Sequence, residues 1–115
     1  MNDDITILVG TSGYGVLRSA DSGATWPRVK GVPLDTTVRV LAGAPSRPKV
    51  VFAGTNWGVM RSDDAGASWR LLPSWPAGAT PWALAVDPSD ENVVYVATGT
   101  PTPPAVYRSA DGGHT

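Results

Sequence analysis

Three aspartates recur in one short pattern and are the first candidates for chemistry. They are Asp21, Asp64 and Asp111, in the stretches SADSGATW (19–26), SDDAGASW (62–69) and SADGGHT (109–115). The alternating oxygen-bearing side chains are faintly similar to a calcium loop, but the downstream bidentate acid and the ladder of oxygen ligands are missing. A short carboxylate can instead accept hydrogen bonds from nearby backbone N–H groups and close a turn. We therefore expect a structural role for these aspartates and no metal site.

A pair of carboxyl groups suited to glycoside hydrolysis is the second candidate. Retaining glycosidases hold two carboxyls about 5–5.5 Å apart, and inverting ones about 6.5–9.5 Å apart. The chain has one glutamate, Glu91, in a PSDEN turn, while Asp87 ends a predicted strand and Asp35 lies in a connection. Sequence spacing alone does not bring two of them together. We therefore predict no catalytic residue, although a pair formed by the fold stays open as an alternative.

Three arginines directly precede the repeated stretches: Arg18, Arg61 and Arg108. A cluster of arginines can clamp a substrate carboxylate. These three, however, are expected at the ends of separate strands beside the repeated loops, and not around a common centre. We expect them to form ion pairs or to pack near the loop aspartates.

Aromatic side chains are the remaining candidates, because exposed rings can stack on sugars. Tyr14 and Trp57 occupy matching loops of successive repeats, and Trp75 and Trp82 lie in or beside a later connection. The alternative is packing between neighbouring sheets, which we expect of Tyr14, Trp57 and Trp82. Trp75, flanked by two prolines, is expected to be exposed. Tyr14, Trp57 and Trp75 nevertheless stay open as possible ligand-face aromatics.

The elements that position these residues form a repeat. Ser19, Ser62 and Ser109 open the three stretches, at spacings of 43 (62 − 19) and 47 (109 − 62) residues. Each stretch follows a β-branched run, a Gly-Thr or Ala-Thr step, a short loop and an Arg-Ser pair. No ten-residue window shows a helical period, and the 13 glycines and 11 prolines fall between short apolar runs. This punctuation is typical of an all-β chain.

The repeat predicts antiparallel sheets of four strands. The predicted strands are 5–10, 15–19 and 26–30 in the first unit, 38–44, 50–55, 58–62 and 69–72 in the second, and 82–87, 93–98 and 105–109 in the third. A four-stranded sheet repeated every ~45 residues is a β-propeller blade. We expect a partial propeller of about two and a half blades, spanning 1–36, 37–80 and 81–115.

The repeated stretch resembles the Asp-box, or BNR repeat, of bacterial-neuraminidase-type β-propellers. The matched positions carry Ser, Asp, Gly, Thr or Ser, and Trp, after a G-T…G-V-x-R-S run. The residues of the implied structural Asp-boxes are Ser19, Asp21, Gly23, Trp26, Ser62, Asp64, Gly66, Trp69, Ser109, Asp111 and Gly113. The resemblance implies that these boxes lie at the periphery of the propeller. We expect a positive φ at the box glycines and tryptophans that open the outer strands and cover the sheets.

The resemblance to BNR-type propellers suggests two functions. Some propellers resembling this chain are non-catalytic, as in photosystem II assembly factors and sortilin-type receptors, and we expect a scaffold or binding module without a cofactor. The alternative is part of a sialidase- or xyloglucanase-type glycoside hydrolase. The tyrosine nucleophile, glutamate partner and arginine triad of sialidases do not map onto this sequence, so the catalytic residues would lie mostly outside it.

Composition restricts the partners. The 9 basic and 10 acidic residues create no field that would attract nucleic acid. The chain has no cysteine and one histidine, His114, which disfavours thiolate and multi-histidine metal sites. The start MNDDITILVG reads as neither a signal peptide nor a membrane span. We expect a cytoplasmic protein if Met1 is the true start, and a secreted one if the chain belongs to a typical longer relative.

The number of blades implies a further partner. Propellers typically have 4–8 blades, whereas one complete and two partial blades are predicted here. The missing blades would come from the same longer chain or from other copies by oligomerisation. The last stretch lacks its tryptophan, so we expect a fragment of a longer propeller. Carbohydrate or protein would be its ligand.

Overall fold

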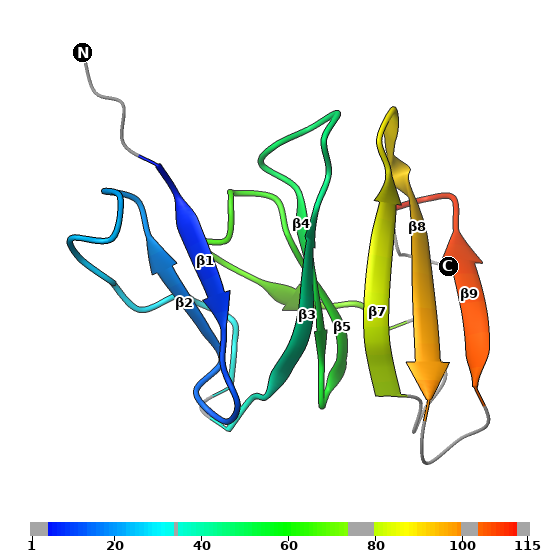
Figure 1. Cartoon of the computed structure of the whole chain (residues 1–115), viewed down its shortest axis with the longest axis horizontal. Helices are drawn as coiled ribbons and strands as arrows, with labels where there is room; N and C mark the ends of the chain where they lie inside the picture. Colours follow the sequence, from blue (N-terminus) through cyan, green and yellow to red (C-terminus); the bar gives the residue numbers. More distant parts are fainter. Residues whose placement is uncertain (1–4, 34, 74–79, 100–103, 113–115) are drawn as a thin grey trace.

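Three antiparallel sheets stand side by side in chain order (Figure 1). The computed structural model describes residues 5–33, 35–73, 80–99 and 104–112. Within these ranges the regular elements are nine strands, and none is a helix. Accordingly, the described part of the chain contains no helix capable of spanning a membrane. The predicted all-β class is confirmed.

Neighbouring strands pair in the order of the sequence within each sheet. The first sheet consists of β1 (Ile7–Gly10) and β2 (Val16–Ser19). The second consists of β3 (Val38–Gly43), β4 (Val51–Thr55), β5 (Gly58–Ser62) and β6 (Arg70–Leu71). The third consists of β7 (Thr80–Asp87), β8 (Asp90–Gly99) and β9 (Ala105–Ser109). Every pairing is an antiparallel hairpin, as the short turns between apolar runs predict.

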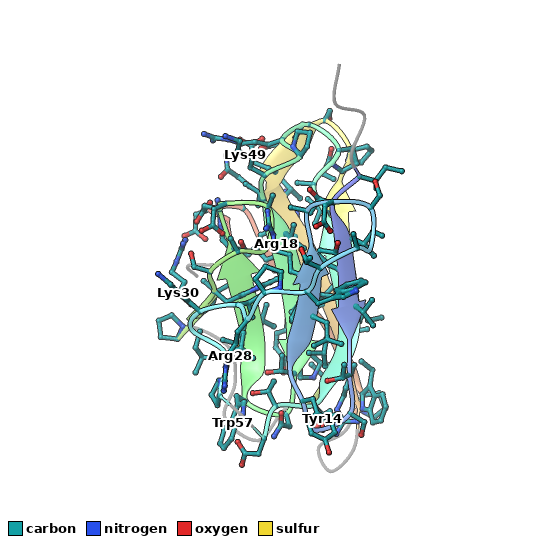
Figure 2. The ribbon with its side chains drawn as sticks, turned by 90° about the vertical axis from the view of Figure 1, so that its left-hand side faces the viewer. Tyr14, Arg18, Arg28, Lys30, Lys49 and Trp57 are labelled. Carbon is teal, nitrogen blue, oxygen red and sulfur yellow. The ribbon has the colours of Figure 1, made fainter. Side chains whose placement is uncertain are left out.

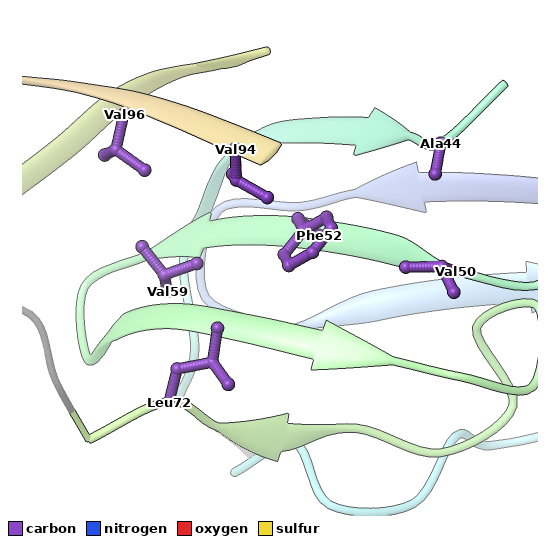
Figure 3. Packing of buried hydrophobic residues seen from close by; sticks show 7 residues of the cluster. All are labelled: Ala44, Val50, Phe52, Val59, Leu72, Val94 and Val96. Atoms are coloured by element: carbon purple, nitrogen blue, oxygen red, sulfur yellow. The ribbon is translucent and has the colours of Figure 1, made fainter. Parts of the chain in front are cut away.

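The second sheet is covered on both faces. All five residues of β4 are buried, because successive side chains of a strand point to opposite faces. One face packs against the third sheet through the cluster shown in Figure 3: Ala44, Val50, Phe52, Val59, Leu72, Val94 and Val96. The other packs against the first sheet through Val16, Val51, Ala53, Met60 and Trp69. Two apolar interfaces thus join the three sheets.

The predicted outer strand at 26–30 is wrong. Only isolated bridges form there, Leu17 with Arg28 and Lys30 with Ser68. Pro27 has no N–H to donate to a ladder, which explains why the strand is interrupted. The segment crosses instead to the second sheet, where the Lys30 N–H donates to the Ala67 carbonyl at 3.1 Å. The described first sheet therefore has two strands where three were predicted.

Other strand bounds differ modestly from the prediction. β6 covers two residues instead of 69–72, although the Leu72 N–H still donates to the Val59 carbonyl at 2.9 Å. β7 and β8 are longer than 82–87 and 93–98, because their ladder begins at the Thr80–Gly99 pair and continues to the Asp87–Asp90 pair at the turn. β5 and β9 have their predicted bounds.

Candidate binding surface

The sheets have two chemically different ends. At the first, here called the box end, lie the repeated loops after β2, β5 and β9 (the box loops) and the turn before β4. At the opposite end, here called the aromatic end, lie the loops that carry Tyr14 and Trp57. Figure 2 shows these two rings together at one end of the molecule and Lys49 near the other. This separation follows from the hairpin topology.

The buried serine organises each box loop. The Ser19 hydroxyl donates to Asp21 Oδ1 at 2.7 Å and accepts the Gly23 N–H at 2.8 Å. Ser62 makes the same two bonds, to Asp64 at 2.7 Å and from Gly66 at 2.8 Å. In the third loop the Ser109 hydroxyl donates to Asp111 Oδ1 at 2.8 Å.

In the first two box loops the aspartate closes the turn from the other side. Asp21 Oδ1 accepts the Thr25 N–H at 2.8 Å, and Asp64 Oδ1 accepts the Ser68 N–H at 2.9 Å. The hydroxyls of Thr25 and Ser68 donate to the second carboxylate oxygen, Oδ2. Both oxygens of each carboxylate are therefore already hydrogen-bonded within the loop.

These bonds shift the acidity of two carboxyl groups. The Thr25 hydroxyl and N–H, followed by the Ser19 hydroxyl, lower the pKa of Asp21 from its ordinary 3.8 to about 2. The Ser68 hydroxyl and N–H do the same for Asp64, whose pKa is also about 2. Hydrogen bonds to the charged form favour ionisation. The aspartates thus act as acceptors in the turn, and their pKa values do not suit a proton donor near neutral pH.

The backbone of the loop is left-handed at two successive residues. Gly23 and Gly66 have φ of 98° and 89°, as the sequence predicts. The preceding residues, Ser22 and Ala65, each have φ of 60°, which sequence reasoning missed. In the third loop, Gly112 occupies the position of Ser22 and Ala65, with φ of 75°. Gly113 lies outside the described residues.

The arginines before the box loops reach beyond their own sheets. Arg61 makes an ion pair with Asp63, beside the box aspartate and not with it. The Arg61 and Arg18 side chains also donate to carbonyls of the following box loop, those of Gly112 and Ala65. The expected ion pair near the box aspartate is confirmed for Arg61, whereas the bonds of Arg18 and Arg61 to the next sheet were not predicted.

Buried or half-buried threonines shape the loops of the aromatic end. The Thr11 hydroxyl donates to the Gly15 carbonyl at 2.6 Å and accepts the Tyr14 N–H at 3.1 Å. Thr55 repeats both bonds, donating to the Gly58 carbonyl and accepting the Trp57 N–H. This is the physical role of the recurring Gly-Thr step, which sequence reasoning noted without explaining. Both aromatic residues therefore occupy equivalent, hydrogen-bonded turns.

The Trp57 ring is fixed from a second side. Its Nε1 donates to the hydroxyl of Thr36 at 3.0 Å, and Thr36 is fully buried. The Asn56 amide oxygen accepts the Thr37 N–H at 2.8 Å, which holds the same connection against the loop. Trp57 nevertheless remains 49% exposed. It is a rigid, half-exposed platform, and not a ring packed between sheets as predicted.

A hollow of about 360 Å³ lies beside this ring. Its lining residues are Gly31, Pro33, Asp35, Trp57, Met60 and Leu71. Apolar groups dominate the lining, and Asp35 supplies its carboxylate. A second hollow of about 280 Å³ lies beyond Pro33 and is bordered by Tyr14. Apolar concavities with a few polar groups are the usual form of a ligand site.

The other aromatic predictions have different outcomes. Tyr14 is 82% exposed, so the expected packing between sheets is wrong for it. Trp82 is 49% exposed, like Trp57, and the Arg39 guanidinium of the second sheet stacks over its ring at 4.4 Å from the centroid, so the expected packing between sheets is met only in part. Trp75 lies outside the described residues. Tyr14 and Trp57 therefore define the candidate surface at the aromatic end.

The candidate acids lie at different ends. Asp35 borders the hollow, whereas Asp87 and Glu91 lie at the box end, where Glu91 pairs with Arg47. Among the described residues, no group of three or more His, Cys, Asp or Glu side chains is placed to hold a metal. The structure thus brings no two of these three acids together at the aromatic end.

Comparison with known proteins identifies the architecture. No family model matches the sequence, and no curated protein matches it. Among solved structures, YCF48 bound to D1 peptide is similar over 100% of this chain, with a TM-score of 0.75 and 18% identity. An ancestral GH74 enzyme matches over 77% of the chain, with a TM-score of 0.61 and 24% identity. The GH74 xyloglucanase from Xanthomonas campestris matches over 94%, with a TM-score of 0.57 and 19% identity.

These similarities establish the fold. The chain is built of β-propeller blades, and the predicted relationship to BNR-type propellers is supported at this level. The chain spans only 37%, 12% and 27% of the three matched chains, well under two thirds of each.

Proposed function

We propose that this chain is part of a non-catalytic β-propeller, a scaffold or binding module whose ligand is an extended peptide. The observation that carries the proposal is the rigid, half-exposed Trp57 beside an apolar hollow. Because the ring is already fixed by its hydrogen bond to Thr36, binding costs little side-chain ordering. The remaining blades would come from a longer chain or from other copies.

The lining of the hollow favours a peptide over a sugar. A sugar needs polar partners for its hydroxyls, and burying unpaired hydroxyls is costly. The side chains of Pro33, Met60 and Leu71 offer apolar contact instead, and Asp35 can pair with a cation. The fitting ligand is a strand-like segment with an apolar side chain next to Arg or Lys. The structural neighbour YCF48, bound to D1 peptide, supports a protein ligand on this architecture.

Tryptophan fluorescence titration tests this proposal. The probes are short peptides with Leu next to Arg, matched peptides with Asp in place of Arg, and xyloglucan oligosaccharides. We expect the Leu-Arg peptides to bind and Trp57→Ala to weaken binding at least tenfold, as is typical of an anchoring aromatic. Binding to Trp57→Ala can be followed by calorimetry.

Two further variants make the result specific. Asp35→Asn should weaken binding of the Leu-Arg peptide and reduce its salt dependence, because an exposed ion pair is screened. Tyr95→Ala, an exposed aromatic on the third sheet, is the matched control and should bind normally. An unchanged affinity in Trp57→Ala would overturn the proposed site.

A glycoside hydrolase is the second candidate, favoured by the similarity to two GH74 enzymes. Tyr14 and Trp57 would then be stacking platforms for sugar rings. Asp35 would need a second carboxyl from another part of the protein. Turnover of fluorogenic sialoside or xyloglucan oligosaccharides by the longer protein would favour this function. Oligosaccharide binding without peptide binding would point the same way.

A further inference from the structure

One arginine bond recurs at both interfaces between the sheets. Arg18 Nε donates to the Ala65 carbonyl at 3.0 Å, from the first sheet to the second. Arg61 Nη1 donates to the Gly112 carbonyl at 2.8 Å, from the second sheet to the third. Each donor directly precedes one box loop, and each acceptor directly follows the aspartate of the next.

The acceptor position has the same geometry in all three box loops. Ser22, Ala65 and Gly112 have φ of 60°, 60° and 75°. The N–H of each donates within its own sheet, to the carbonyls of Ile5, Lys49 and Asn92 respectively. In two of these loops the carbonyl of the same residue accepts the arginine bond from the preceding sheet. The Ser22 carbonyl is the equivalent acceptor at the first sheet.

The donor position is also preserved in the third sheet. Arg61 pairs in register with Phe52 and lies 5.4 Å from its ring centroid. Arg108 pairs in register with Tyr95 and lies 6.0 Å from its ring centroid. Arg108 therefore stands where Arg61 stands, on the face of the third sheet that no described sheet covers.

Both open faces carry apolar side chains. The alternation of β8 and β9 puts Tyr95, Ala97, Val106 and Arg108 on one face, the trailing face, where Val106 is 72% exposed. On the far side of the first sheet, the leading face carries Val9, Leu17 and Trp26, all large and exposed. Figure 1 shows the first and third sheets at opposite ends of the row. The strand pairing that forms each open face matches the strand pairing at the corresponding covered interface.

We propose that the trailing face binds the leading face of a second copy of this chain, with Arg108 donating to the Ser22 carbonyl. A second copy is chosen as the partner because of the two covered interfaces. At each of them, the face that corresponds to the trailing face packs against the face of the next sheet that corresponds to the leading face. Among the described residues, one open face of each kind remains. Two copies contribute six described sheets, three from each, which lies within the 4–8 blades of known propellers. This head-to-tail contact concerns different residues from peptide binding and does not depend on it.

The main test measures molar mass by light scattering during size-exclusion chromatography over a wide concentration range. We expect the chain to dimerise with rising concentration. Arg108→Met keeps apolar contact but removes the donor, and should raise the dimer dissociation constant about 10- to 100-fold, the range for a hydrogen bond to a charged group. Arg47→Met, an exposed arginine at the box end, is the matched control and should not change it.

A mixing experiment tests the head-to-tail geometry. Val106→Asp blocks the trailing face and Leu17→Asp blocks the leading face, both at exposed positions where folding should persist and circular dichroism can verify it. Each variant alone should be monomeric, whereas the mixture should form a heterodimer through the two intact faces. A wild-type chain that stays monomeric at every concentration overturns the proposal. So does a Val106→Asp variant that still dimerises alone.

Discussion

The first and second box loops have the same internal bonds but different surroundings. In both, the serine hydroxyl, the aspartate carboxylate and the indole N–H make equivalent hydrogen bonds. Yet Trp26 is 42% exposed and Trp69 is 6% exposed. The difference comes from the segment at 27–31, which crosses from the first sheet and lies directly over Trp69.

The contact over Trp69 depends on one glycine. Gly31 has φ of 85°, and a Cβ there would overlap the Trp69 backbone carbonyl. The Trp69 N–H donates to the Lys30 carbonyl at 2.9 Å, so the two backbones are directly bonded. The comparison therefore separates two contributions: the loop obtains its shape from its own residues, and the ring is buried by the preceding sheet.

Removing the two indoles should give the largest contrast. Trp69→Ala should lower the free energy of unfolding by about 3–5 kcal/mol, because it opens a cavity in a packed interface. Trp26→Ala should cost about 1 kcal/mol, since much of that ring is already in water. Urea unfolding followed by circular dichroism measures both. Equal losses would contradict the view that the neighbouring sheet makes the difference.

Removing the arginines should give a smaller contrast in the same direction. Arg61→Met should cost about 2–3 kcal/mol, because the Gly112 carbonyl and the Asp63 carboxylate lose their buried, charged donor. Arg18 is only half-buried and makes one such bond, so Arg18→Met should cost about 1 kcal/mol. The same unfolding measurement applies. A greater loss in Arg18→Met would show that burial does not decide the strength of this bond.

The box aspartates should give the smallest and most equal effects. Both folded pKa values lie below the unfolded value, so the carboxylates stabilise the fold above about pH 4 and lose this contribution as the pH falls toward 2. Asp21→Asn and Asp64→Asn should each lower Tm at neutral pH, and each difference from the wild type should shrink toward pH 2. Peptide affinity should be unchanged. Thermal unfolding over this pH range measures both differences. If the difference shrank toward pH 2 in only one of the two variants, the shared mechanism would be refuted.

The repeat made most of the fold predictable. Near-constant spacing between the serines, together with β-branched runs and Pro-Ser turns, located the hairpins and gave β5 and β9 their bounds. The first outer strand failed for two reasons. Pro27 is a strand breaker already visible in the sequence, whereas the crossing of 27–31 to the second sheet is a tertiary contact that propensity in a short segment does not register. The blade limits at 1–36, 37–80 and 81–115 remain predictions.

The candidate surface was only half predictable. Matching loops correctly paired Tyr14 with Trp57, but their exposure depended on Thr11, Thr55 and Thr36, whose hydroxyl bonds fix the turns. The Gly-Thr step was a usable signal for two of these bonds. The hollow was not predictable, because its lining comes from three separate segments of the chain that only the fold brings together.

The arginine bonds also bear on how the chain folds. The hydrogen bonds within a box loop join residues two to four positions apart, whereas the two arginine bonds join residues 47 and 51 positions apart. Local contacts form at low entropic cost, and distant ones must wait for the intervening chain to become ordered. Each hairpin and its loop can therefore nucleate independently, and the arginine bonds between neighbouring sheets form late. Pulse-labelling hydrogen exchange should reflect this order, with the Gly23 and Gly66 N–H groups inside the loops becoming protected before the Lys30 N–H, which donates to the second sheet.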